Sequence, residues 1–92
     1  MITKRLSDSV KMRDFDDFKL LLTMYSKEHL DFKRSKLNIV GFTFEVMVFS
    51  ETTHLRVFHR DYSLHSEWYS KEEQAIRAAY GIYRGLFQSC FL

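Results

Sequence analysis

The sequence predicts an α+β fold: a single domain in which a three-stranded antiparallel sheet is flanked by two helices, in the order α-β-β-β-α. An apolar stripe with helical spacing starts at residue 14, three segments of alternating apolar and polar residues lie within 42–69, and a second helical stripe fills 70–88. The chain of 92 residues has the length of one domain. Two amphipathic helices can cover one face of such a sheet and leave its second face open.

Residues 1–13 precede the first helix and fit two kinds of secondary structure. Ile2, Leu6, Val10 and Met12 all stand at even positions, as in a short strand, but the first three are also four residues apart, as in a helix. We describe this segment as an N-terminal arm or extra strand.

The first helix is expected over residues 14–29. Its apolar positions recur at steps of three and four residues and form one stripe: Phe15, Phe18, Leu21, Leu22 and Tyr25. Acidic residues at positions 14, 16 and 17 fall in the first turn, where they interact favourably with the helix dipole. The segment DFKRSKLN, residues 31–38, is polar and is expected to be a connector.

Three strands are expected within residues 42–69. The segment GFTFEVMVF alternates between two faces, HLRVFHR runs back after the turn SETT, and LHSEWY follows the turn DYS. On the middle strand the alternation puts His54, Arg56, Phe58 and Arg60 on one face and Leu55, Val57 and His59 on the other.

The last helix is expected over residues 70–88. SKEE at its start is a capping box, in which the Ser70 hydroxyl accepts from the Glu73 amide and the Glu73 carboxylate accepts from the Ser70 amide. The expected buried stripe is Ile76, Ala79, Tyr80, Tyr83, Leu86 and Phe87.

The cations and aromatics of the sheet are the predicted partner-binding site. If the helices cover the Leu55–Val57 side, a surface rich in arginine and aromatic residues faces outward, and such residues are enriched at binding hot spots. The predicted site consists of His54, Arg56, Phe58, Arg60, Phe49 and Tyr69. In the alternative, the N-terminal arm or the C-terminal residues CFL fold over this face and make it core.

The charge distribution predicts a second set of contacts. The formal net charge is only +2, but residues 1–36 hold nine Lys/Arg against six Asp/Glu, whereas residues 37–92 hold five against six. A small net charge does not indicate general adhesion to nucleic acid or membrane. Local contact with nucleic acid is predicted for Lys33, Arg34, Lys36 and Arg77.

The sequence gives no sign of catalytic chemistry. His54 and His59 point to opposite faces of a strand because their separation is odd, no recognisable motif pairs Cys90 with a base, and the glycines form no phosphate loop. We therefore expect a protein that is not an enzyme and needs no metal or cofactor. A single cysteine excludes an internal disulfide, and the lack of a signal peptide or membrane-spanning segment predicts a cytoplasmic protein.

The element order and the segment SKEEQAIRAAYGIY resemble the double-stranded-RNA-binding domain. That family enters its last helix through a serine and lysines followed by small residues, which Ser70, Lys71, Ala75, Ala78 and Ala79 match in part. The resemblance implies the helix–three strands–helix order, with Lys71 placed to contact phosphate. The chain departs from the family at Glu72 and Glu73, and at SETT, where the family has a glycine–proline–histidine turn. In size, composition and the absence of proline, the chain also resembles small phage-encoded inhibitors such as anti-CRISPR proteins.

These observations predict a non-catalytic binding protein. The favoured interpretation is a phage-type inhibitor that blocks a host protein or ribonucleoprotein complex by occupying its surface, with contact to RNA or DNA, in the host cytoplasm. The alternatives are an RNA-binding domain of the double-stranded-RNA-binding order and a homodimeric interaction module with Phe49, Phe58 and Tyr69 at its interface.

Overall fold

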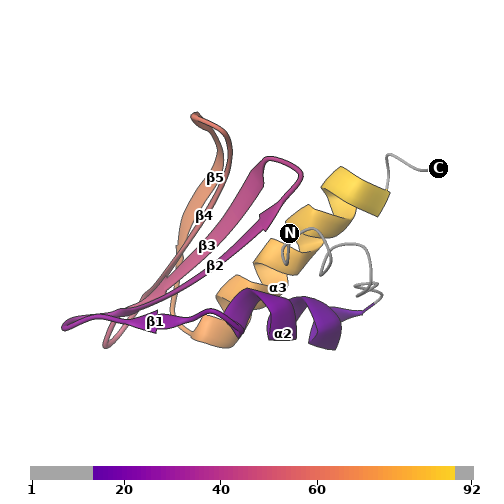
Figure 1. Ribbon diagram of the computed structural model, residues 1–92. Coiled ribbons are helices and arrows are strands. Elements are labelled where there is room, and N and C mark those ends of the chain that lie inside the picture. The colour runs from indigo at the N-terminus through magenta and orange to yellow at the C-terminus, as the bar shows by residue number, and fades with distance from the viewer. Residues whose placement is uncertain (1–13, 89–92) are drawn as a thin grey trace.

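The computed structural model describes residues 14–88, which form a twisted sheet with two helices on one side (Figure 1). The elements follow in the order α2 (Phe15–Thr23), β1 (Lys27–Glu28), β2 (Lys33–Ile39), β3 (Phe42–Val48), β4 (Thr53–His59), β5 (Tyr62–Tyr69), α3 (Glu72–Tyr83) and the π-helical turn η1 (Arg84–Gln88). The predicted arm, residues 1–13, and the C-terminal residues 89–92 lie outside the described residues.

The sheet has five strands, so the prediction of a three-stranded sheet is wrong. Its order is β1-β2-β3-β4-β5, and every neighbouring pair is antiparallel. The two additional strands come from the stretch that was expected to end the first helix and form a polar connector. The α+β class stands, and the order is helix, five strands, helix.

Strand β2 is hard to recognise because the face that the helices cover is partly polar. Ser35 is fully buried, and its hydroxyl is hydrogen-bonded to that of Ser26 at 2.7 Å. Lys33, on the same face, pairs with Glu72 of α3 at 3.1 Å. Apolar alternation therefore starts only at Leu37 and Ile39, which is too short a pattern to indicate a strand.

Helix α2 begins as expected but ends at Thr23 rather than at residue 29. The Asp14 side chain caps it by accepting from the Asp17 amide at 3.0 Å. The Ser26 amide then donates to the Thr23 carbonyl, and Tyr25 is exposed instead of joining the apolar stripe. The chain after α2 is thereby free to form the short strand β1.

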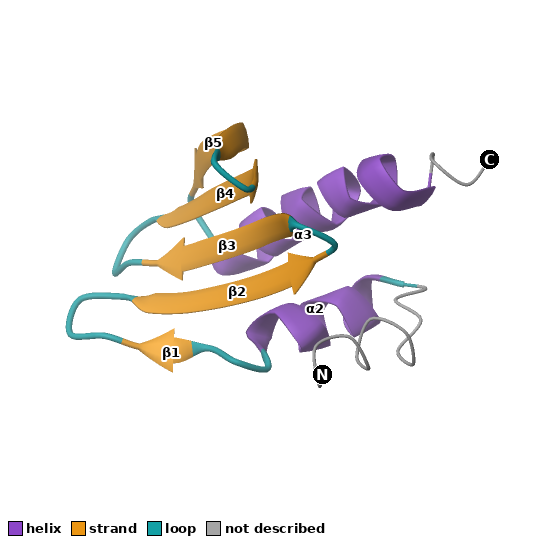
Figure 2. Ribbon diagram, turned by 45° about the horizontal axis from the view of Figure 1, so that its top comes forward, coloured by secondary structure: helices purple, strands orange, loops and turns teal. Residues whose placement is uncertain are grey.

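The core lies between the helices and one face of the sheet. Figures 1 and 2 show α2 and α3 on the same side, with α2 against β2 and α3 behind β3 and β4. Phe18 of α2 packs edge-to-face on Phe44 of β3, with ring centroids 5.7 Å apart. The buried apolar residues are Phe18, Leu21, Leu22, Ile39, Phe44, Val46, Leu55, Val57, Ala75, Ile76 and Ala79.

Helix α3 starts one residue later than expected and has different capping contacts. Lys71, not Ser70, is the N-cap residue, and the Lys71 amide donates to the Gln74 side-chain oxygen at 3.2 Å. The Ser70 hydroxyl donates to the same oxygen at 2.9 Å. Gln74 thus takes the role predicted for Glu73, because the helix begins one residue later than expected.

Two-residue turns join β2 to β3 and β4 to β5. Val40 (φ 48°) and Gly41 (φ 87°) form the first, and Arg60 (φ 59°) opens the second. Positive φ at the turn positions matches the right-handed twist of the flanking strands, and Asn or Gly adopts it most readily. Val40 is β-branched, so its backbone is strained in this turn. Arg60 stands in the turn, not on the strand as expected.

Candidate binding surface

The open face is the side of the sheet opposite the helices (Figure 2). The pairing register decides which side chains it presents. Across β2 to β5 the register aligns two rows of outward side chains, Arg34–Met47–His54–Trp68 and Lys36–Glu45–Arg56–Ser66.

Glu45 sits at the centre of the open face and is 2% exposed. Its Oε1 accepts from Arg56 Nε at 3.1 Å and lies 2.8 Å from Arg56 Nη2, and its Oε2 accepts from Arg34 Nη1 at 3.4 Å. The two arginines come from the strands on either side, so β2, β3 and β4 are linked by one carboxylate. Each arginine side chain remains about half-exposed and available to a partner.

Four rings follow one another across one end of the open face. Phe32 lies 5.3 Å from Phe49, Phe49 lies 5.8 Å from Trp68, and Trp68 lies 4.5 Å from His54, measured between ring centroids. We call these four residues the aromatic row. Trp68 is 58% exposed, although a tryptophan of a small domain is ordinarily well buried.

A basic hollow of about 350 Å³ lies on β1 and β2 beside the aromatic row. Its lining residues are Tyr25, Lys27, Arg34, Lys36 and Asn38. Three of them are cations and none is a carboxylate. Lys27 pairs with Arg34 in the strand register, which brings two of these charges to adjacent strands.

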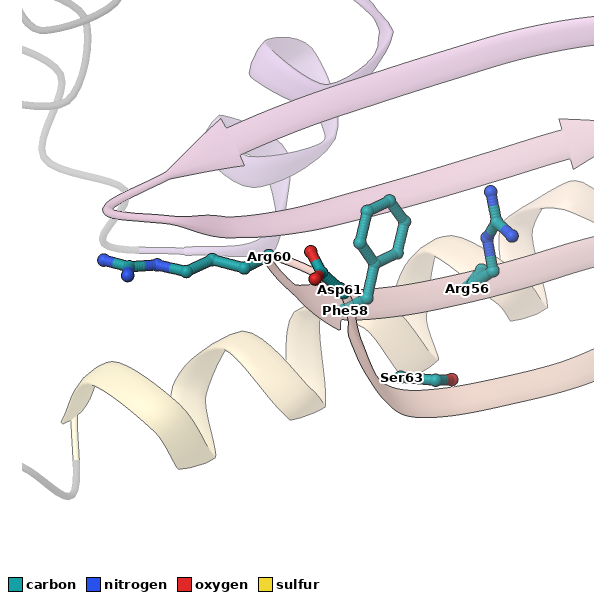
Figure 3. A pocket seen from close by; sticks show the side chains of 5 residues that line it. All are labelled: Arg56, Phe58, Arg60, Asp61 and Ser63. Atoms are coloured by element: carbon teal, nitrogen blue, oxygen red, sulfur yellow. The ribbon is translucent and has the colours of Figure 1, made fainter.

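A second hollow, of about 280 Å³, lies over the end of β4 and is lined by Arg56, Phe58, Arg60, Asp61 and Ser63. Figure 3 shows Arg56 and Phe58 projecting to the same side of β4, whereas Arg60 extends away from them. The Arg56 guanidinium lies 4.9 Å from the centroid of the Phe58 ring, within reach of a cation–π contact. Arg56 and Phe58 thus lie together as expected, but Arg60 does not continue their row.

A β-bulge in β5 decides which aromatic residue faces outward. His59 pairs with Tyr62 and Phe58 with Ser63, but Val57 pairs with His65, so Leu64 is the extra residue. Trp68 therefore joins His54 on the open face. Tyr69, which we expected on that face, lies on the helix-covered side, where its hydroxyl is 3.2 Å from His65 Nε2 and burial raises its pKa.

The four residues of the predicted nucleic-acid site do not lie together. Arg34 and Lys36 line the basic hollow, but Lys33 lies on the helix-covered face. Arg77 lies on α3, where it pairs with Glu73 at 3.3 Å and stacks on Phe15 at 4.2 Å. Alternation along β2 separates Lys33 from Arg34 and Lys36, so once the strand is recognised only the latter two are expected on the open face.

Phe32, Lys27, Glu45 and Trp68 belong to the surface but not to the site predicted from sequence. Alternation along GFTFEVMVF puts Glu45 on the same face as Phe49, and this is a usable signal for Glu45. Lys27 and Phe32 could be assigned to this surface only if β1 and β2 were recognised as strands. Trp68 could be assigned to it only if the β-bulge were known, and nothing in the sequence indicates that bulge.

The rest of the described chain offers little for other chemistry. Within residues 14–88 no group of three or more His, Cys, Asp or Glu side chains is close enough to hold a metal ion. In the same range, no helix is both long and apolar enough to cross a bilayer. Burial raises the pKa of the Tyr83 hydroxyl in the core, as expected for a packed tyrosine.

Comparison with known proteins finds no matching family model, no matching curated protein and no matching solved structure. The function is therefore argued from the geometry of the open face.

Proposed function

We propose that this protein is a non-catalytic binding protein that acts by covering the surface of its partner with the open face of its sheet. The observation that carries the proposal is the position of Trp68, beside Phe49 and His54 on the side opposite the core. A small domain gains stability by burying such rings between sheet and helices, so an exposed tryptophan beside partly exposed rings favours an intermolecular role.

The charges around the aromatic row support the same proposal. Arg34 and Arg56 are held in place by Glu45, so little side-chain entropy is lost when they contact a partner. Arginine and aromatic residues at the centre of a patch are the usual hot spots of interfaces. The biological role that we favour is that of a phage-type inhibitor, of the anti-CRISPR kind, that occupies the surface of a host nucleoprotein complex.

A homodimeric module is less well supported. The interface considered for it, Phe49, Phe58 and Tyr69, is divided between the two faces of the sheet. A two-fold dimer through the open face would also bring the two basic hollows, and their like charges, into the same interface.

The test compares the wild type with a variant of the open face in affinity capture. Phe58→Ala combined with Trp68→Ala removes two rings and replaces no residue of the Glu45 ion pairs, and Lys19→Met on α2 is the control. Captured complexes are identified by mass spectrometry, and the fold of each variant is checked by circular dichroism and thermal unfolding.

We expect the double variant to lose at least about 2 kcal/mol of partner binding while the control retains it. A partner that binds both variants and the wild type equally, with all three folded, would show that the open face is not the binding surface. Loss of folding in the double variant would contradict the proposal too, because it would place these rings in the core.

A further inference from the structure

The open face carries an excess of positive charge that a partner must complement. Its outward side chains on β1 to β5 include four cations, Lys27, Arg34, Lys36 and Arg56, and one carboxylate, Glu45, which leaves an excess of three charges. The Glu45 carboxylate is buried beneath Arg34 and Arg56, so a partner that approaches the open face contacts cations first. A polyanion is favoured over a neutral or cationic surface.

The aromatic row distinguishes among polyanions. An acidic protein surface would pair with the cations but has no set of flat groups for Phe49 and Trp68. Unpaired bases do, because each base presents a π face and stacks on aromatic side chains with little sequence preference. In a duplex the base faces are stacked inside the helix, so the row favours a single strand.

The basic hollow and the aromatic row are arranged so that one nucleic-acid strand can contact both. A line of residues aligned by the strand register crosses the sheet from β1 to β5: Lys27, Arg34, Met47, His54 and Trp68. With neighbouring strands about 4.8 Å apart, this path is roughly 19 Å long. It has the length of a few nucleotides, at the short end of the ≈ 4–16 that one OB-fold module covers.

We infer that the open face binds single-stranded nucleic acid, with phosphate groups in the basic hollow and bases stacked on the aromatic row. The inference rests on the proposed function, because it names the chemical class that this face recognises. A free strand and a strand exposed within a nucleoprotein complex share this chemistry.

The chain reports on this binding directly, because Trp68 is its only tryptophan. Single-stranded DNA and RNA probes of about 12 nucleotides, and a duplex of the same length, are titrated into the protein while Trp68 emission is followed. Anisotropy of a labelled probe measures the affinity of variants that lack the tryptophan. We expect stacking to quench the emission for a single strand and the duplex to bind more weakly.

Two variants separate stacking from charge. Trp68→Ala should weaken binding about fivefold or more, since one stacked base is worth about 1–3 kcal/mol. Lys27→Ala with Lys36→Ala should reduce the slope of log affinity against log salt by about 1.4, which is ≈ 0.7 for each phosphate contact. Lys19→Met removes one charge from the helix layer and should leave the slope and the affinity unchanged.

The inference is overturned by duplex binding equal to single-strand binding, or by affinity that Trp68→Ala does not change. It is overturned as well if no probe binds at low salt and capture of the partner complex survives nuclease treatment. In that last case, capture of a protein complex that depends on Trp68 and Phe58 would still support the proposed function, and the partner would be an acidic protein surface. If a strand binds only as part of a captured complex, nuclease treatment should release the protein, and capture that survives nuclease contradicts the inference.

Discussion

Glu45 is the residue whose replacement best tests how the open face is held together. Glu45→Gln keeps the size of the side chain and removes its charge. In the protein the carboxylate is almost fully buried and accepts two hydrogen bonds, from Arg56 Nε at 3.1 Å and from Arg34 Nη1 at 3.4 Å, and Arg56 Nη2 lies 2.8 Å from it. In the variant the amide oxygen accepts more weakly, and the amide nitrogen directs a donor toward guanidinium groups that cannot accept.

The magnitude follows from the exposure of the partners. Breaking a fully buried ion pair costs about 3–5 kcal/mol because a charge is left without a partner in the interior. Here the side chains of Arg34 and Arg56 are 38% and 46% exposed and can turn into water, so most of that penalty is avoided. What is lost is a pair of charge-assisted hydrogen bonds, and we expect a loss of about 2 kcal/mol in the free energy of unfolding.

Thermal and urea unfolding measure this loss. About 2 kcal/mol in a domain of this size lowers Tm by roughly 8–16 °C. A double-mutant cycle with Arg56→Gln should give a coupling energy of about 1 kcal/mol or more between positions 45 and 56. An unchanged Tm in Glu45→Gln, or additive effects in the cycle, would refute the view that this carboxylate ties the three strands together.

Two further predictions concern a turn and the helix layer. Val40→Asn should raise the free energy of unfolding by about 1 kcal/mol, because asparagine adopts the positive φ of this turn more readily than a β-branched residue; Val40→Ala is the control, and equal stability of the two variants would contradict the reasoning. Lys19 Nζ donates to Glu73 Oε1 at 3.0 Å and holds the pKa of that carboxyl below its ordinary value. Because the pKa is lowered in the folded state, the pair stabilises the protein above the ordinary pKa, and this contribution is lost as the pH falls through the folded value. An NMR titration should show the pKa of Glu73 returning toward its ordinary value in Lys19→Met, and no change there would exclude Lys19 as the cause.

The helices and three of the five strands could be predicted because their signals are local. Phe18, Leu21 and Leu22 repeat with helical spacing, and Phe44 and Val46 alternate with polar neighbours, so their burial follows from period alone. These periods also predict the α+β fold class and the helix at each end of the domain. They predict as well that Arg56 and Phe58 face the same side of β4.

The rest depends on tertiary contacts that a period does not reveal. On the helix-covered face of β2, Ser35 is hydrogen-bonded to Ser26 and Lys33 is ion-paired with Glu72. Neither partner lies in β2, so the alternation within β2 does not reveal that these polar side chains are accommodated there. The face of Trp68 depends on one extra residue, Leu64, since a shift of one position turns every later side chain of β5 to the other side. Simple alternation from the turn would put Trp68 in the core and Tyr69 outside, which is the reverse of what the bulge produces.

The order of the strands in the sheet is also their order in the chain, and this bears on how the protein folds. Each strand pairs with its neighbour in sequence, so the sheet can form hairpin by hairpin through short loops whose closure costs little entropy. Such local topology is associated with fast folding. The contact between the two helices closes a much longer loop, because Lys19 and Glu73 are 54 residues apart in sequence. Phe18 of α2 covers Phe44, but β4 lies against α3, so we expect docking of this helix to be the step that makes an early, transient sheet persistent.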